Sequence, residues 1–235
     1  MLYIMINKYT IYGERCSGTN YLFDILNINF DAEITWDYGW KHFFGFQDEE
    51  LQDSDNTLFI CIVRNPVDWI NSFYREMHHL HLKYKTTLSE EAKLDEFLNK
   101  EFWSINDDDG NNDIVNEKME DRNIYTGERY KNIFELRHTK IKWLLTDLPN
   151  KVKNYVFIRY EDLKYDFTNT VLQIKNKGLK FKEHITSPIN TNRYKNTPEI
   201  FVEKTNTIES SVIMNNPNLI KTYEKELKYI YTDEE

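Results

Sequence analysis

The residues whose types and spacing most clearly suggest chemistry surround a short loop near the start of the chain. Gly13 and Gly18, two of only seven glycines, enclose four residues between an apolar run at 9–12 and a segment that predicts a helix from about Thr19 to Leu26. Glycine lets the backbone N–H groups of such a strand–loop–helix unit turn inward, and the helix start adds a partial positive charge. The loop therefore predicts an anion site, with a tight turn that binds nothing as the alternative.

The spacing of the two glycines equals that of the phosphate-binding loop of nucleotide triphosphatases. In that loop a lysine follows the second glycine directly, whereas this chain has Thr19 at the position. The lysine contacts the terminal phosphates of ATP or GTP, so its absence argues against nucleotide hydrolysis. A kinase that phosphorylates a small metabolite remains the alternative enzyme class.

A second candidate group for anion binding follows a buried strand. The run at 57–63, rich in residues that favour strands, predicts this strand, and Asn65 and Pro66 suit the N-cap and first turn of a following helix. Arg64 ends the strand and Ser72 lies eight residues later, so a guanidinium fork and a hydroxyl could share one phosphate. Anion-binding groups at the carboxyl ends of two parallel strands favour one elongated ligand with phosphates at both ends. A surface ion pair is the alternative explanation for the arginine.

Together these motifs resemble those of the sulfotransferase family, which transfers a sulfuryl group from 3′-phosphoadenosine 5′-phosphosulfate (PAPS). Residues 14–21 resemble the family's loop for the 5′-phosphosulfate, and residues 62–74 resemble its motif for the 3′-phosphate. Residues 159–163 are similar to the segment that lies near the adenine. Residues 40–43 resemble the region that supplies the catalytic base in several members.

The resemblance implies roles for particular residues. Catalysis would involve His42 as the base that takes the acceptor's proton, with Arg15 or Lys41 neutralising the leaving group. Arg193 and Lys195 are the nearest candidates for the family's late basic motif. Contacts to PAPS are implied for Arg15, Cys16, Ser17, Gly18, Thr19, Asn20, Arg64, Ser72, Tyr160 and Arg193.

The resemblance also implies a fold and a reaction. The fold would be α/β and three-layered, with a mostly parallel central sheet flanked by helices and the P-loop NTPase-like architecture of sulfotransferases. PAPS would be the cosubstrate, no metal ion would be needed, and the acceptor would be a hydroxyl or amine of a small molecule or glycan. Cys16 stands where many members have a lysine, which keeps open a non-enzymatic alternative, an interaction module on a nucleotide-binding fold.

Other segments predict helices and strands in alternation. Helices are expected at 66–80, 87–102, 141–148 and after Pro217, and a further strand at 155–159. The helix at 87–102 would open with a capping box at Thr87 and Glu90, and Pro149 would end the helix at 141–148. Strands separated by helices need crossover connections, which favours a parallel sheet. We expect one domain over 1–235, with an acidic loop or insertion at about 104–123.

Composition limits the partners of the chain. Its 30 Lys and Arg against 39 Asp and Glu give a net charge of −9, which opposes binding to a nucleic-acid backbone. The longest apolar run, 58–63, is far shorter than the ~20 residues of a membrane span, so no membrane association is expected. Two cysteines without a recognisable secretory leader favour a cytoplasmic location. His78, His79 and His81 favour a solvated helix end over a zinc site.

Overall fold

The computed structural model describes residues 6–46, 48–85, 89–105, 107, 121–188, 190–193, 197–200, 202 and 204–230, with the side chains of 48–50, 190–193 and 197–200 excluded. The chain forms two compact units. The first consists of Met1–Asn65 and Leu144–Thr205, and the second of Pro66–Trp143 and Asn206–Glu235. None of the helices within the described ranges is both long and apolar enough to cross a membrane.

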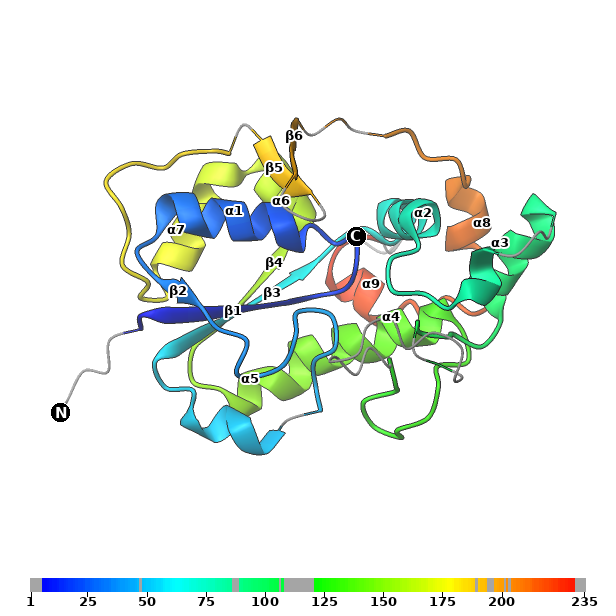
Figure 1. Cartoon of the computed structure of the whole chain (residues 1–235), viewed down its shortest axis with the longest axis horizontal. Coiled ribbons are helices and arrows are strands. Elements are labelled where there is room, and N and C mark those ends of the chain that lie inside the picture. Colours follow the sequence, from blue (N-terminus) through cyan, green and yellow to red (C-terminus); the bar gives the residue numbers. More distant parts are fainter. Residues whose placement is uncertain are drawn as a thin grey trace. The chain divides into compact units, whose positions relative to one another are not determined.

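The first unit is built on a parallel four-stranded sheet (Figure 1). Its strands are β1 (Lys8–Gly13), β2 (Glu33–Ile34), β3 (Thr57–Val63) and β4 (Tyr155–Arg159), in the order β2-β1-β3-β4. The register pairs Gly13 with Ile62 and Val63 with Arg159, so three strands end at nearly the same level. The predicted α/β class with a parallel central sheet is confirmed, and the segments that follow these strands share one edge of the sheet.

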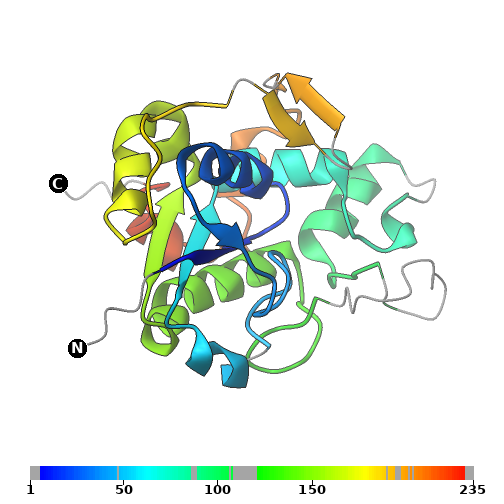
Figure 2. The same ribbon diagram turned by 60° about the vertical axis from the view of Figure 1, so that its left-hand side comes forward.

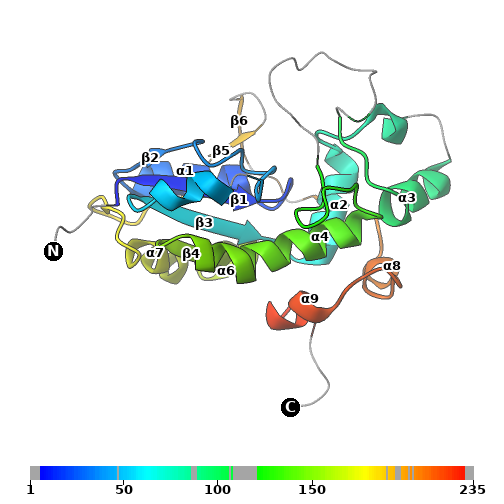
Figure 3. The ribbon, with the colours of Figure 1, turned by 90° about the horizontal axis from the view of Figure 1, so that it is seen from below.

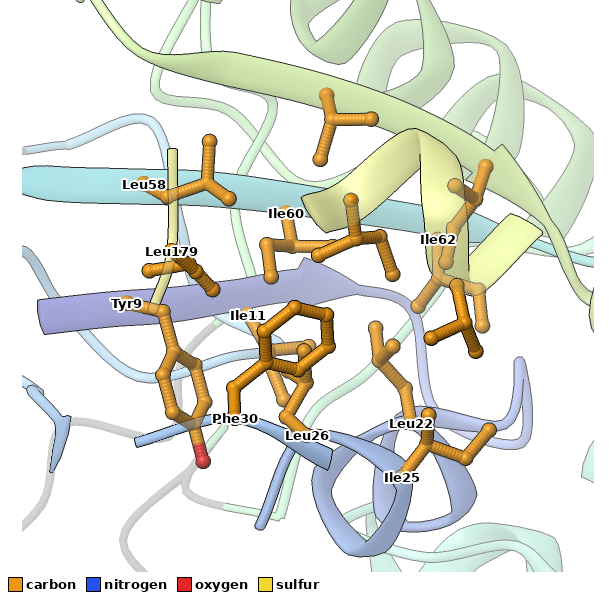
Figure 4. Close-up of a cluster of buried hydrophobic side chains, with 14 of the residues drawn as sticks. Tyr9, Ile11, Leu22, Ile25, Leu26, Phe30, Leu58, Ile60, Ile62 and Leu179 are labelled. Atoms are coloured by element: carbon orange, nitrogen blue, oxygen red, sulfur yellow. The ribbon is translucent and has the colours of Figure 1, made fainter. Parts of the chain in front are cut away.

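Helices cover one face of the sheet, and Figure 4 shows the core that they form with it. Side chains alternate between the two faces of a strand, so this face of β1 and β3 presents Tyr9, Ile11, Leu58, Ile60 and Ile62. The helices packed against them are α1 (Thr19–Asn29), α6 (Tyr160–Tyr165) and α7 (Phe167–Lys175). The loop between Gly13 and Gly18 thus runs directly from a buried strand into a buried helix.

The opposite face of the sheet is covered by the segment 35–46 and by the helical stretch after Leu144. Tyr12 of β1 stacks on Phe44 with ring centroids 5.1 Å apart, and Phe59 of β3 lies 5.1 Å from Tyr38. The Tyr155 hydroxyl donates to the carbonyl of Leu144 at 2.7 Å. This aromatic packing holds the segment 35–46 against β1, which matters for the site described below.

A two-stranded antiparallel hairpin completes the first unit. Its strands, β5 (Asn190–Arg193) and β6 (Thr197–Ile200), pair with each other (Figure 2). Strand β5 also contacts α1. The hairpin follows an extended segment that is attached to the end of α1. There the Asn29 amide donates to the carbonyl of Thr186 and accepts from its N–H group, at 2.8 and 2.7 Å.

The second unit is helical in the part of it that the structure describes. Its helices are α2 (Pro66–Glu76), α3 (Glu90–Asn99), α4 (Ile133–Lys142), α8 (Ser210–Met214) and α9 (Thr222–Glu226), with a 3₁₀ turn at Leu82–Lys85. Figure 3 shows α9 beside α4, and α8 also contacts α2. Arg137 of α4 donates to the Glu224 carboxylate of α9 at 2.6 and 2.9 Å, and both side chains are buried.

Two predicted helices are shorter than expected. The helix that opens at Pro66 ends at Glu76 and not near Leu80, because Met77 and His79 adopt left-handed φ angles of 33° and 58°. The three clustered histidines therefore lie beyond the helix, and no three metal-ligating side chains gather within the described residues. The helix predicted at 87–102 spans Glu90–Asn99 instead, with Ser89 as N-cap accepting from the Ala92 N–H.

The prediction that Thr87 caps that helix lies outside the described residues, since 86–88 are not described. Pro149 was expected to end a helix, and this prediction is wrong. The helical path continues from α4 through a π turn, Trp143–Asp147, into α5 (Leu148–Lys151). Pro149 lies in the first turn of α5, the part of a helix where proline is best tolerated. The helix expected after Pro217 is short and begins at Thr222.

The acidic segment predicted at 104–123 is described only at its two ends. Asp107 accepts from the Ser104 N–H at 2.6 Å and pairs with Arg122. The Asp121 carboxylate forms an ion pair with the ammonium of Lys140 on α4, with Nζ and Oδ1 2.7 Å apart, and both side chains are buried. The ends of the segment are therefore attached to the helical unit by buried charges rather than left in solvent.

Candidate active site

The glycine loop has the backbone geometry of an anion site. Cys16 and Gly18 adopt left-handed φ angles of 63° and 95°, and alternation of right- and left-handed residues makes a concave row of N–H groups. The Ser17 N–H and hydroxyl both donate to the carbonyl of Glu14, at 3.1 and 2.5 Å, which closes the turn. Thr19 opens α1 and Gly18 gives no side-chain cap, so the first-turn N–H groups have no acceptor within the helix.

Both glycines are required by close approach of other atoms. A Cβ atom on Gly13 would lie 2.6 Å from the Ile62 carbonyl oxygen and 2.9 Å from the Ser17 hydroxyl. A Cβ atom on Gly18 would lie 2.4 Å from the ring of Tyr160. The first contact sets β1 tightly against β3, and the second seats an aromatic ring on the start of α1. Neither Gly13 nor Gly18 can therefore be replaced by a larger residue without a shift of the neighbouring atoms.

Arg64 and Tyr160 meet the loop at the same edge of the sheet. The Arg64 guanidinium donates to the carbonyl of Cys16 at 3.3 Å and lies 4.9 Å from the centroid of the Tyr160 ring. Glu161, the next residue, accepts from the Asn65 N–H at 2.8 Å and so joins the segments that follow β3 and β4. Three strand ends therefore place the loop, a guanidinium and an aromatic ring in one cluster.

The segment 35–46 brings Lys41 and His42 to the other side of the loop. The Gly13 N–H donates to the carbonyl of Lys41 at 2.9 Å, and His42 Nδ1 lies 2.7 Å from the carbonyl oxygen of Gly13. The Lys41 ammonium donates to the Asn20 side-chain oxygen at 2.5 Å. Burial lowers the pKa of Lys41 to about 8. A partly dehydrated ammonium and an imidazole consequently stand beside the anion loop.

Arg15 faces the protein interior rather than solvent. Its side chain is 1% exposed, pairs with Glu14 at 3.4 Å and lies 5.3 Å from the centroid of the Phe43 ring. Phe43 in turn stacks almost parallel to Trp40, with an interplanar angle of 8°. The arginine of the loop is thus already neutralised by a carboxylate, whereas Lys41 is held by an uncharged amide.

Two of the predicted ligand contacts are not tested by the described structure. Ser72 lies on α2, in the second unit. Arg193 lies on β5, but its side chain is outside the described part, as is all of Lys195. Their assignments remain predictions from the sequence.

The side chains of two further residues of the cluster make contacts that the sequence analysis does not predict. Asn20 contributes an amide to Lys41, and Glu161 receives an N–H group from the turn after β3. Both lie within motifs that the sequence marks, but their partners are far away along the chain. Sequence spacing carries no signal for such long-range contacts.

Comparison with known proteins gives limited information about this site. No family model and no curated protein matches the chain. Among solved structures, the crystal structure of the mouse sulfotransferase SULT7A1 complexed with PAP matches with 16% sequence identity and a TM-score of 0.43. The match covers 75% of this chain and 61% of the mouse chain, so less than two thirds of the latter is represented. A similarity this low does not place the chain in a family, and function has to be derived from the residues at the sheet edge.

Proposed function

We propose that the protein is a sulfotransferase that moves a sulfuryl group from PAPS to a hydroxyl or amine of an acceptor. The observation that best supports this proposal is the convergence of the anion loop with Arg64 and Tyr160 at one sheet edge. PAPS carries anionic groups at two positions of its ribose, the 3′ and 5′ oxygens, and a planar base at C1′. A row of N–H groups, a guanidinium and an aromatic ring are the three kinds of group that such a ligand requires.

The cosubstrate contacts are assigned by chemistry and position. The N–H groups of residues 18–20, together with the Thr19 hydroxyl, hold the 5′-phosphosulfate, while the Ser17 N–H closes the turn on the Glu14 carbonyl. Arg64 binds the 3′-phosphate and Tyr160 lies against the adenine, while Ser72 and Arg193 are assigned to the 3′-phosphate from the sequence alone. Arg64 leaves the Cys16 carbonyl for the ligand at little cost, because a charge-assisted bond to phosphate is stronger than a bond to a neutral carbonyl.

The transfer step needs a cation at the bridging oxygen. The acceptor oxygen or nitrogen forms a bond to sulfur while the bond from sulfur to the phosphate oxygen breaks, and that oxygen keeps the electron pair. We assign its neutralisation to Lys41 and not to Arg15, since Arg15 is buried and already paired with Glu14. As in phosphoryl transfer, the protein acts mainly by positioning and by stabilising charge.

The proton of the acceptor is assigned to His42. A neutral imidazole that donates from Nδ1 to the Gly13 carbonyl carries its lone pair on Nε2. The loop backbone therefore fixes the tautomer that a base requires. The acceptor proton moves to Nε2 as the bond to sulfur forms.

Calorimetric titration tests the proposed cosubstrate. The protein is titrated with 3′-phosphoadenosine 5′-phosphate (PAP), the product of PAPS, and separately with ATP and magnesium. We expect binding of PAP alone, and a loss of about 10- to 100-fold in affinity in Arg64→Ala, as expected for a charge-assisted bond. Lys153→Ala is the control, because Lys153 is exposed near the amino end of β4 and pairs there with Asp55. Preference for ATP would indicate a kinase, and indifference to both ligands a non-enzymatic module.

His42→Asn tests the catalytic assignment. An Asn amide can replace Nδ1 as donor to the Gly13 carbonyl, but it lacks a base at the Nε2 position. We therefore expect unchanged PAP affinity with transfer of labelled sulfuryl group reduced about 10²- to 10⁴-fold, the usual contribution of a general base. Transfer is measured from PAPS to a panel of glycans, phenols and lipids. Full activity of the variant would exclude His42 as the base.

A further inference from the structure

The anion loop lacks a lysine of its own. Thr19 occupies the position where a triphosphatase loop has one, and Cys16 is the residue just before the Ser17–Thr19 segment. Arg15, the basic residue within the loop, is buried against Glu14. A cation for the loop's ligand therefore has to come from another segment. Lys41 reaches the first turn of α1, where its ammonium contacts the Asn20 side chain.

Backbone contacts fix the position of Lys41 but not of its ammonium. The Gly13 N–H bonds the Lys41 carbonyl, and His42 bonds the Gly13 carbonyl, so the segment is attached to the end of β1. A lysine side chain has a flexible four-carbon stem and loses much rotamer freedom when its end is held. The contact that holds the end is the 2.5 Å hydrogen bond to Asn20 Oδ1.

We infer that Asn20 is a positioning residue that holds the Lys41 ammonium at the start of α1, so that Lys41 replaces the lysine that the loop lacks. The inference rests on the proposed function, because it concerns the ligand of the same loop. It assigns a role to the Asn20 side chain, in addition to the contact made by its backbone.

The neutrality of the amide is what makes Asn20 suitable for this role. A carboxylate at position 20 would neutralise the ammonium, as Glu14 neutralises Arg15, and would repel an anionic ligand. An amide oxygen orients the ammonium and leaves its full charge for the ligand. The other charged or titratable groups around the loop include Arg64, His42, Tyr160, the Cys16 thiol and the Glu14–Arg15 pair.

The first test measures the Lys41 amine directly, without a ligand. Its pKa is obtained from the pH dependence of its labelling by acetic anhydride, read by mass spectrometry. We expect Asn20→Asp to raise the pKa of Lys41 by at least about one unit, and Asn20→Ala to lower it, since a bond to the charged form favours that form. Asp is compatible with the first turn of a helix, so the variant should fold.

Asn150→Asp provides the matched control for the charge change. Asn150 is exposed on α5, near the amino end of β4, and bonds the Thr146 carbonyl at 2.6 Å. This variant should leave the pKa of Lys41 unchanged. Equal Lys41 pKa values in wild type, Asn20→Asp and Asn20→Ala would overturn the inference.

The second test measures PAP affinity in a double-mutant cycle. We expect Lys41→Met and Asn20→Ala each to weaken binding, by about 10- to 100-fold for the lysine, and the double variant to bind no more weakly than Lys41→Met. Additive losses would show that the two side chains act separately and would overturn the inference while the proposed function stands. A wild-type protein that does not bind PAP would instead overturn the proposed function, and with it this inference.

Discussion

Gly18 shows how a single residue without a side chain shapes the site. Its φ angle of 95° is strained for any other residue, and its Cα supports the ring of Tyr160. That ring in turn lies beneath the Arg64 guanidinium. A change at Gly18 would therefore displace two residues assigned to the cosubstrate, although Gly18 itself offers only a backbone.

Substituting Gly18 with alanine separates backbone strain from steric contact. We expect Gly18→Ala to cost about 1–2 kcal/mol for the left-handed backbone and a further ~1–3 kcal/mol for the Cβ contact with Tyr160. Gly127→Ala is the control, because Gly127 has a φ of 73° but no atom within 4 Å of the added Cβ. Free energies of unfolding come from urea titrations. Equal losses in the two variants would contradict the tight packing of Tyr160 on the loop.

The sequence predicts the residue types of the site better than their environments. The row from Ser17 to Asn20 and the pair Lys41–His42 all lie at the loop, as their motifs suggest. The sequence does not show that Arg15 is buried against Phe43, because that contact depends on how the segment 35–46 packs across β1. Burial is a tertiary property, and a basic residue in a motif reads the same whether it faces a ligand or the interior.

At the scale of elements, predictions succeed where a local signal is sufficient. The apolar run of β3 and the turn at Asn65 and Pro66 lie within a few residues of each other, and the strand spans 57–63 as predicted. The end of α2 is different. No proline or glycine marks Glu76, and the left-handed φ angles of Met77 and His79 have no local signal in the sequence.

The buried ion pair between α4 and α9 is the element-scale contact with the largest expected effect. We expect Arg137→Met or Glu224→Met alone to cost about 3–5 kcal/mol, because each leaves a buried charge without its partner. The double variant should cost less than either single variant, since apolar side chains need no partner. Urea unfolding of the three proteins measures these differences.

Lys153→Ala again serves as the control for that cycle. The Lys153–Asp55 pair is exposed, so its loss should cost under about 1 kcal/mol. If the double variant lost more stability than either single variant, Arg137 and Glu224 would stabilise the protein by more than neutralising each other's buried charge. Its role in attaching α9 would then need another explanation.

At the scale of the whole molecule, the net charge of −9 opposes an anionic ligand. We expect the proposed site to overcome this repulsion locally, through N–H groups, Arg64 and Lys41. We expect the association rate of PAP to rise as salt increases from 0.01 to 0.15 M, because the Debye length falls from about 30 to about 8 Å and the long-range repulsion is screened.

Stopped-flow measurements with a fluorescent PAP analogue test this salt dependence. The association rate of an uncharged adenosine analogue should stay nearly constant over the same range, which controls for changes in the protein. An association rate of PAP that falls with salt would mean that attraction from the site extends beyond the protein surface. In that case the overall charge would not govern the approach of the ligand.

The division of the first unit along the chain also has a consequence for synthesis. β3 pairs with β4, yet residues 64–154 lie between them. While a ribosome is still making that interval, the outer edge of β3 has no neighbour, and such an edge invites association with other nascent chains. Tyr160 emerges only after β4. The site therefore forms late in translation, and a polypeptide truncated before this point would hold the glycine loop without the aromatic ring that covers it.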